Sequence, residues 1–191
     1  MKRPRRAPTR AQVPQKWAPV LREGHAPLKK WTVPVVEVLV ESARWKARRG
    51  VKPLLRRALS EAAATLSTSD AELAIVLTDD SAIRSLNRQW RGKDEPTNVL
   101  AFPAQQPGTA SRAHRLIGDI VIAYQTLARE AAAERKPFKH HLAHLSVHGF
   151  LHLSGHDHET DHEAAAMEGL EIAILARLGI PNPYVARGRG G

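Results

Sequence analysis

Hydrophobic residues along the chain alternate between short β-branched runs and longer stretches with helical spacing. Runs rich in Val, Ile and Leu predict strands at residues 33–40, 72–77 and 116–122. A shorter strand is expected at residues 98–102, where Pro103 ends it. The run at residues 116–122 is apolar almost throughout, which is typical of a strand in the interior of a sheet.

Apolar residues three and four positions apart predict helices between and after these strands. The five expected helices are bounded by proline, glycine or capping residues and cover residues 53–66, 79–92, 124–136, 137–155 and 161–178. Strands interleaved with helices, without an internal repeat or a second core, predict one α+β domain. We expect a mixed sheet of about four strands packed against about five helices.

The composition narrows the class of protein. The 191 residues, 42% hydrophobic and 25% charged, suit one globular domain with a tail. The chain has no cysteine, which excludes disulfides and thiolate ligands, so any metal must be held by His, Asp or Glu. No apolar run approaches the ~20 residues that cross a bilayer, and no signal-peptide core follows the basic N-terminus. We therefore expect a cytoplasmic protein with no membrane partner.

The net charge of +10 is concentrated near the N-terminus. Residues 1–30 carry nine Lys and Arg against Glu23 alone, with five prolines, and predict a flexible basic arm. The arm has two interpretations that composition does not separate, an RNA-backbone contact by counterion release or a solubilising tail. The folded domain is expected over residues 31–182, followed by a flexible tail at residues 183–191.

One motif carries the candidate chemistry, the pattern H-x-x-x-H-x-x-G-x-x-H at residues 148–158. A helix presents His148 and His152 on one face, with their Cβ atoms about 5–6 Å apart. Gly155 falls where a glycine can end the helix, so that the returning chain brings His158 to the same ion. Three histidines leave one tetrahedral position open, as in catalytic zinc sites. The sequence therefore predicts a metal site at the end of a buried helix.

Three observations qualify this prediction. Eight of the ten histidines lie within residues 140–162, so pairs four apart also arise by chance and only the full pattern distinguishes the trio. His156 could compete as the third ligand. Gly149 stands where the H-E-x-x-H metalloproteases carry their glutamate general base, which disfavours peptide hydrolysis. If the strand at residues 98–102 is an edge strand, it would border the groove that leads to the metal.

The motif and three other segments together resemble the YbeY endoribonucleases, the rRNA maturation factors of bacteria. The segments that carry the resemblance lie in the family's order, at residues 85–94, 96–103, 116–122 and 148–158. The similarity covers roughly residues 33–180. This chain departs from the family's usual residues at His156, Ala101 and Asn98, and none of these is a ligand position.

This resemblance implies a zinc-dependent endoribonuclease specific for single-stranded RNA. In the family the motif histidines bind zinc, which implies one ion per chain on His148, His152 and His158. The resemblance also implies maturation of the 3′ end of the small-subunit rRNA, with the small ribosomal subunit as partner. It makes Arg91 the catalytic arginine, whose guanidinium fork suits phosphate. The other role open to Arg91 is to bond the last helix carbonyls before Gly92.

Two aspartates are candidates for supporting the ligands. Asp157 could hydrogen-bond the second nitrogen of a ligand histidine, cap the next helix or brace the turn. Asp119 lies in an apolar strand and is either another such carboxylate or the partner of an arginine, because an unpaired buried aspartate is too costly.

No residue of the motif is an evident general base, which leaves the nucleophile open. Attack by an activated water would leave a 5′-phosphate, whereas attack by the RNA 2′-hydroxyl would leave a 2′,3′-cyclic phosphate. Two further functions compete with a nuclease. One is a noncatalytic, zinc-stabilised ribosome assembly factor, and the less favoured one is a metalloprotease.

Overall fold

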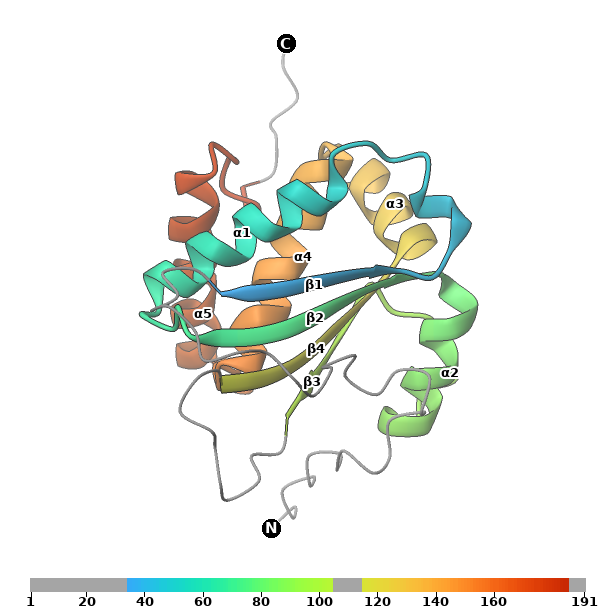
Figure 1. Ribbon diagram of the computed structural model, residues 1–191, viewed down its shortest axis with the longest axis horizontal. Helices are drawn as coiled ribbons and strands as arrows, with labels where there is room; N and C mark the ends of the chain where they lie inside the picture. The colour runs from blue at the N-terminus through green and yellow to red at the C-terminus, as the bar shows by residue number, and fades with distance from the viewer. Residues whose placement is uncertain (1–33, 105–114, 186–191) are drawn as a thin grey trace, which may run out of the picture.

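The computed structural model describes residues 34–104 and 115–185 of the chain (Figure 1). The predicted basic arm at residues 1–30 lies outside the described residues, as do residues 105–114 and 186–191. The described residues form a four-stranded sheet and five α-helices, which confirms the predicted α+β fold.

The sheet is mixed and has the strand order β1-β2-β4-β3. Its strands are β1 (Val35–Val40), β2 (Ala71–Thr78), β3 (Val99–Pro103) and β4 (Arg115–Ala123). β1, β2 and β4 are parallel to one another, whereas β3 pairs with β4 in the antiparallel direction. The apolar strand β4 lies inside the sheet, as its sequence predicts, and the short strand β3 forms an edge.

The helices follow the predicted boundaries closely. They are α1 (Val51–Thr65), α2 (Asp80–Arg91), α3 (Tyr124–Ala133), α4 (Phe138–Leu153) and α5 (Asp161–Arg177). α1 begins two residues before Pro53, since the first N–H groups of a helix have no partner within it and a proline fits there. A short 3-10 helix, η3 (Ala43–Trp45), is absent from the prediction. Within the described parts of the chain, no helix combines the length and apolar character needed to cross a membrane.

Local signals set the two helix ends that frame the site. Asp79 caps α2, because its side chain accepts a hydrogen bond from the Ala82 backbone N–H at 3.1 Å. Gly92 (φ 70°) ends α2, and Gly155 (φ 92°) follows the end of α4. Both glycines adopt the left-handed conformation that glycine favours, which confirms the two predicted helix stops.

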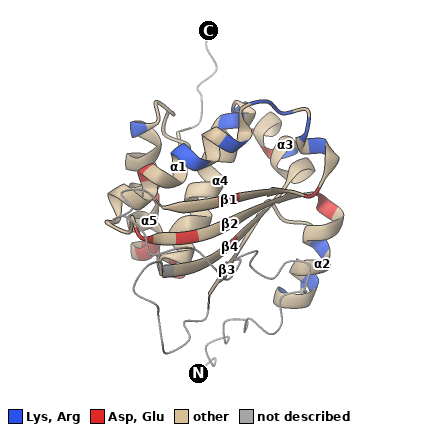
Figure 2. Cartoon of the chain, viewed as in Figure 1, with Lys and Arg blue, Asp and Glu red and all other residues tan. Residues whose placement is uncertain are grey.

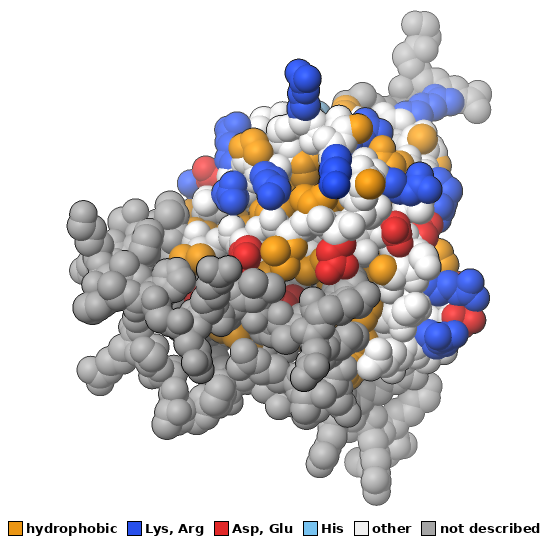
Figure 3. Space-filling view, turned by 45° about the vertical axis from the view of Figure 1, so that its right-hand side comes forward, with side chains coloured by type: hydrophobic (Ala, Val, Ile, Leu, Met, Phe, Trp, Pro, Cys, Tyr) orange, Lys and Arg blue, Asp and Glu red, His pale blue; other side chains and the backbone are white. Residues whose placement is uncertain are grey.

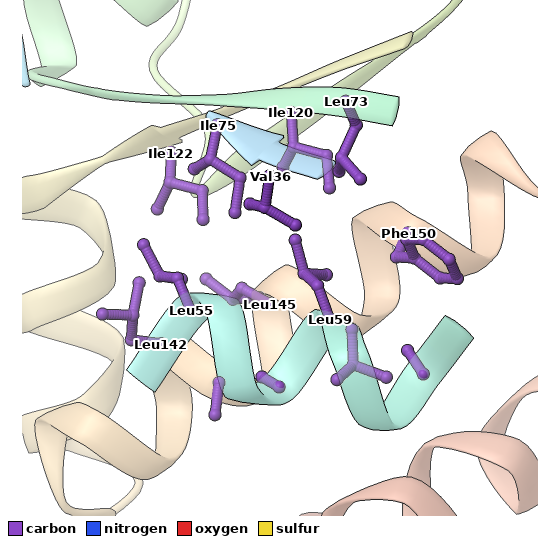
Figure 4. Packing of buried hydrophobic residues seen from close by; sticks show 14 of the residues in the cluster. Val36, Leu55, Leu59, Leu73, Ile75, Ile120, Ile122, Leu142, Leu145 and Phe150 are labelled. Carbon is purple, nitrogen blue, oxygen red and sulfur yellow. The ribbon is translucent and has the colours of Figure 1, made fainter. Parts of the chain in front are cut away.

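Hydrophobic side chains on the two faces of the sheet form two clusters. The larger cluster joins the sheet to α1, α4 and α5, and the smaller one joins the opposite face to α2. Figure 4 shows strand and helix side chains of the larger cluster pointing toward one another, namely Val36, Leu73, Ile75, Ile120, Ile122, Leu55, Leu59, Leu142, Leu145 and Phe150. α4 is buried along most of its circumference, as predicted, so packing determines where its histidines lie.

α4 approaches the sheet closely at Gly149. A Cβ atom at this position would lie 3.0 Å from Cγ2 of Ile120 on β4, which is tighter than ordinary van der Waals contact. The residue after His148 therefore faces the sheet, and a glutamate there would force the helix away from β4.

The Gly118→Ala substitution is expected to lower the free energy of unfolding by about 2–4 kcal/mol. Gly118 has φ 139°, and a Cβ atom there would lie 2.2 Å from the backbone oxygen of Phe102, so that β3 and β4 would have to separate locally. Thermal or urea unfolding of the purified variant measures the effect.

Gly169→Ala is the matched control, because a Cβ atom at Gly169 meets nothing within 4 Å. This glycine lies inside α5, where alanine is the better helix former by about 1 kcal/mol. The control should be neutral or slightly stabilising. Equal stability of the two variants would show that β3 tolerates displacement at Gly118.

Candidate metal centre

Three histidines each bring one ring nitrogen to a common point. His148 and His152 lie one turn apart on α4, and His158 lies in the connection to α5 beyond Gly155. Their ligand atoms all lie within 4.8 Å of one another. Among residues 34–104 and 115–185 this is the one group of three or more His, Asp or Glu side chains with such geometry. The trio that the motif predicts is therefore assembled, and it could hold a metal ion.

Hydrogen bonds determine which nitrogen of His148 and His152 is free. Nδ1 of His148 donates to Oε1 of Glu171 at 2.8 Å, and Nδ1 of His152 donates to the backbone oxygen of His156 at 3.1 Å. Because both acceptors lack a proton, each Nδ1 carries the hydrogen, and in the neutral imidazole Nε2 is then the nitrogen with the lone pair. The two histidines thus have the tautomer that binds a metal through Nε2.

The two free nitrogens face each other. Nε2 of His148 lies 3.1 Å from Nε2 of His152, and two lone pairs at this distance repel unless a cation lies beside them. A tetrahedral ion with metal–nitrogen distances of about 2.0–2.1 Å holds two ligand nitrogens roughly 3.3 Å apart. The observed spacing fits such an ion.

The surroundings of His152 also favour its neutral form. Burial, together with the neighbouring His148 and His158, lowers the pKa of the His152 imidazole. A neutral imidazole can coordinate a metal without first losing a proton. Burial and the neighbouring histidines, which disfavour the protonated form of His152, therefore leave this ring ready to coordinate an ion.

Glu171 is the functional residue that sequence analysis did not identify. It lies on α5 with 1% of its surface exposed, and its carboxylate contacts His148 through Oε1 and His144 through Oε2 at 2.7 Å. Burial alone would raise the pKa of the Glu171 carboxyl, but the hydrogen bonds from the two histidines outweigh it and lower the pKa to about 2. Glu171 therefore stays ionised and orients His148.

One signal in the sequence could have indicated Glu171. It occupies the buried stripe of α5 between Met167 and Ile174, where the helical period otherwise places apolar residues. A carboxylate in such a stripe needs a partner. The spacing could not show that the partner is His148, because the two residues lie on different helices.

The C-terminal segment reaches the same carboxylate. The Tyr184 hydroxyl donates to Oε2 of Glu171 and lies 3.4 Å from Nε2 of His144. Pro183 is buried. The segment predicted as a flexible tail, residues 183–191, thus begins with residues that support the site, and its last six residues lie outside the described part.

A groove of about 460 Å³ opens onto the three histidines. The edge strand β3 lines it, so the expected border of the site by this strand is confirmed. Arg91, the last residue of α2, lines the same groove, and its side chain makes no hydrogen bond or ion pair with any described residue. Its guanidinium is therefore available to a ligand, and it does not bond the helix carbonyls.

The other candidate residues take separate places. Asp157 accepts a hydrogen bond from the His158 backbone N–H at 2.9 Å and lies 3.8 Å from Nδ1 of His152, so that it braces the turn. His156 contributes its backbone oxygen to His152, and its ring is not part of the three-histidine group.

Asp119 is not brought to the three histidines. Side chains alternate along a strand, so Asp119 projects on the same side of β4 as Val121, which packs toward α2. Ile120 projects on the opposite side, toward α4. Asp119 is buried and is not among the residues that line the groove.

Comparison with known proteins gives one consistent family. The family model described as Endoribonuclease YbeY matches residues 39–179, a range that includes all five helices and the three histidines. A protein of that name from Nitrobacter hamburgensis is 57% identical over 162 residues, with 82% of this chain and 85% of the relative covered. Its counterpart from Nitrobacter winogradskyi is 56% identical over 167 residues, covering 85% and 87%. That from Rhodopseudomonas palustris is 54% identical over 160 residues, covering 82% and 93%.

Proposed function

The chain belongs to the Endoribonuclease YbeY family, and we propose that it is a zinc-dependent endoribonuclease that cleaves single-stranded RNA. The observation that carries the proposal is the pair of Nε2 atoms 3.1 Å apart, facing a groove that also contains the unpaired Arg91. A metal site beside a free guanidinium suits a phosphodiester substrate.

The proposed zinc ligands are His148, His152 and His158, with one ion per chain. No described Asp or Glu joins this group, so a zinc ion held by these three histidines would have room for a further ligand from the groove. When bound, zinc supplies Lewis acidity to a phosphoryl oxygen and lowers the pKa of a water molecule. Glu171 orients His148, and Asp157 holds the turn that carries His158.

Arg91 is the proposed catalytic residue. Its guanidinium can donate two parallel hydrogen bonds to non-bridging phosphate oxygens, and it keeps its charge at any working pH. Charge that develops on these oxygens during cleavage would be stabilised there. The absence of a described carboxylate partner for Arg91 supports this role, because a paired arginine would have to leave its partner first.

We also propose a biological role in rRNA maturation in the cytoplasm, at the 3′ end of the small-subunit rRNA, with the small ribosomal subunit as partner. The family membership supports this role. A peptide substrate is disfavoured by Gly149, since the position of a protease-type glutamate packs against Ile120.

The direct test uses the purified zinc-loaded protein and one RNA oligonucleotide, single-stranded or annealed to its complement. We expect about one zinc per chain and cleavage of the single strand only. The new ends, a 5′-phosphate or a 2′,3′-cyclic phosphate, would identify the nucleophile. A folded, zinc-loaded protein that cuts neither RNA would favour a noncatalytic assembly factor instead.

Glu171→Gln is expected to weaken zinc binding by about 10–100-fold. Glutamine has the shape of glutamate but lacks the charge that orients and polarises His148, so the ligand becomes less basic. Competition with a chromogenic chelator measures the affinity. Glu41→Gln is the control and should keep wild-type affinity, because Glu41 is exposed directly after β1 and lines neither cavity beside the histidines. Equal affinities for the two variants would show that Glu171 does not support the ion.

A further inference from the structure

We propose that an exposed basic strip, formed by residues 44–57, binds the phosphate backbone of RNA outside the catalytic groove. The inference rests on the proposed function in one respect, namely that RNA is the substrate. It adds a second contact region, which would hold the RNA that flanks the cleaved bond.

The strip contains seven cations and no carboxylate. All seven side chains are exposed, and none forms an ion pair with a described residue. They are Arg44, Lys46, Arg48, Arg49, Lys52, Arg56 and Arg57. Unpaired cations in this number form a strong local positive potential, which is the usual electrostatic signature of nucleic-acid binding.

The strip does not reflect general basicity of the domain. Residues 1–30 and the strip together contain 16 of the 29 Lys and Arg residues, and the rest of the chain has 13 basic against 18 acidic side chains. Figure 2 shows blue positions on α1 and the segment that precedes it. In Figure 3 the basic side chains form a band above a separate row of acidic ones. On the face shown, most basic side chains therefore lie apart from the row of acidic ones.

The strip is presented on a rigid scaffold. Trp45 is buried between its exposed neighbours, and its Nε1 donates to the backbone oxygen of Thr78 at 2.7 Å. Nε of Arg48 donates to the Tyr124 hydroxyl at 2.9 Å, and its guanidinium carbon lies 4.4 Å from the centre of the Phe138 ring. These anchors lower the entropy cost of holding the cations against a ligand.

The strip lies beside the end of α4 that is remote from the metal centre. A Cβ atom at Gly50 would lie 3.3 Å from Nζ of Lys139, in the first turn of α4, whereas His152 is in its last turn. The 13 residues from Lys139 to His152 span about 20 Å of helix. Because α4 is buried, RNA must pass over the surface, so a strand with a rise of about 3.4 Å per stacked nucleotide needs at least roughly six nucleotides to reach from the groove to the strip.

The side chains of the strip favour RNA over a membrane. Five of the seven cations are arginines, which bind phosphate oxygens in a bidentate manner. Membrane-surface helices also insert large apolar side chains. Among the described residues the exposed large hydrophobic side chains are Tyr184 and Val185, which lie outside the strip. The strip therefore has the charge for a polyanion without the apolar anchor for a bilayer.

The test compares wild type with the triple variant Lys52→Gln, Arg56→Gln, Arg57→Gln. The probe is an RNA duplex of about 20 base pairs, which a single-strand nuclease leaves intact, and salt is varied from about 50 to 200 mM. We expect at least tenfold weaker binding at about 100 mM salt. The slope of log affinity against log salt should fall by about two to three. For a single-stranded substrate of about 20 nucleotides, KM should rise while kcat stays unchanged, and a tetranucleotide should be cleaved at the wild-type rate.

The matched control removes three cations that already have carboxylate partners, Arg129→Gln, Lys136→Gln, Arg177→Gln. This control variant loses the same three positive charges as the strip variant and should keep most of its affinity for the duplex. Melting curves test whether both variants fold. Equal losses in the two variants, or no loss in the strip variant, would overturn the inference. So would loss of binding to phosphatidylserine vesicles with RNA binding unchanged, which would assign the strip to a membrane. If the duplex binds through the strip but the protein cleaves no RNA, the proposed nuclease activity would be overturned and the strip would remain an RNA-binding surface.

Discussion

Replacing His148 and His152 together by alanine should abolish zinc binding and reduce RNA cleavage by at least about 10³-fold. The double variant removes both facing Nε2 atoms and leaves His158 as the single remaining ligand of the group. A single imidazole binds zinc too weakly to retain the ion during gel filtration, because several ligands from one chain must bind the ion together. Metal analysis after gel filtration and cleavage of a labelled single strand measure the two effects.

A loss of folding must be separated from a loss of metal. His158→Ala serves this purpose, since His158 is exposed and its removal leaves α4 and the core unchanged. We expect His158→Ala to bind no zinc and to cleave no RNA. Its melting temperature should equal that of the wild type from which a chelator has removed the metal. His162→Ala, an exposed histidine outside the group, is the control and should retain both. Full cleavage by the double variant would exclude the metal from catalysis.

Arg91→Ala should lower kcat by about 10²–10³-fold, the range seen when one donor to a charged transition state is removed. Arg91 is exposed and has no described partner, so the substitution should leave zinc content and melting temperature unchanged. Arg91→Lys keeps the charge but loses the planar fork of the guanidinium. Its kcat should lie between that of the wild type and that of Arg91→Ala. Single-turnover cleavage with saturating enzyme measures the chemical step.

Arg88→Ala is the matched control for Arg91. Arg88 lies one turn earlier on α2, faces Asp94 at 3.7 Å and does not line the groove. It should cleave RNA at the wild-type rate. If Arg91→Ala lowered the melting temperature and left cleavage unchanged, Arg91 would be a structural residue at the helix end. Mapping of rRNA ends in cells carrying Arg91→Ala would then separate chemistry from assembly, because a noncatalytic factor predicts normal ends.

Support for the three-histidine group comes from three separate parts of the chain. Glu171 on α5 holds His148, the backbone oxygen of His156 holds His152, and Tyr184 reaches Glu171 from the C-terminal segment. Such second contacts determine tautomer and ring orientation before an ion arrives. A preorganised site of this kind would lose little entropy on binding a metal ion.

Features that depend on neighbouring residues could be predicted from the sequence alone. The helical period places His148 and His152 on one face, and Gly155 turns the chain because its left-handed conformation needs no other contact. Strand and helix positions followed from hydrophobic periodicity for the same reason. The family's motifs then indicated Arg91, which spacing alone could not relate to the histidines.

Only the tertiary structure decided which distant side chains meet. Glu171 lies 23 positions after His148 on another helix, and Arg91 reaches the groove because α2 packs on the sheet face opposite α4 and ends beside β3. Asp119 is directed away from the site by the pleat of β4 and by the order of the strands. Periodicity is a property of a single element, whereas these contacts arise from the way several elements bury their apolar faces against one another.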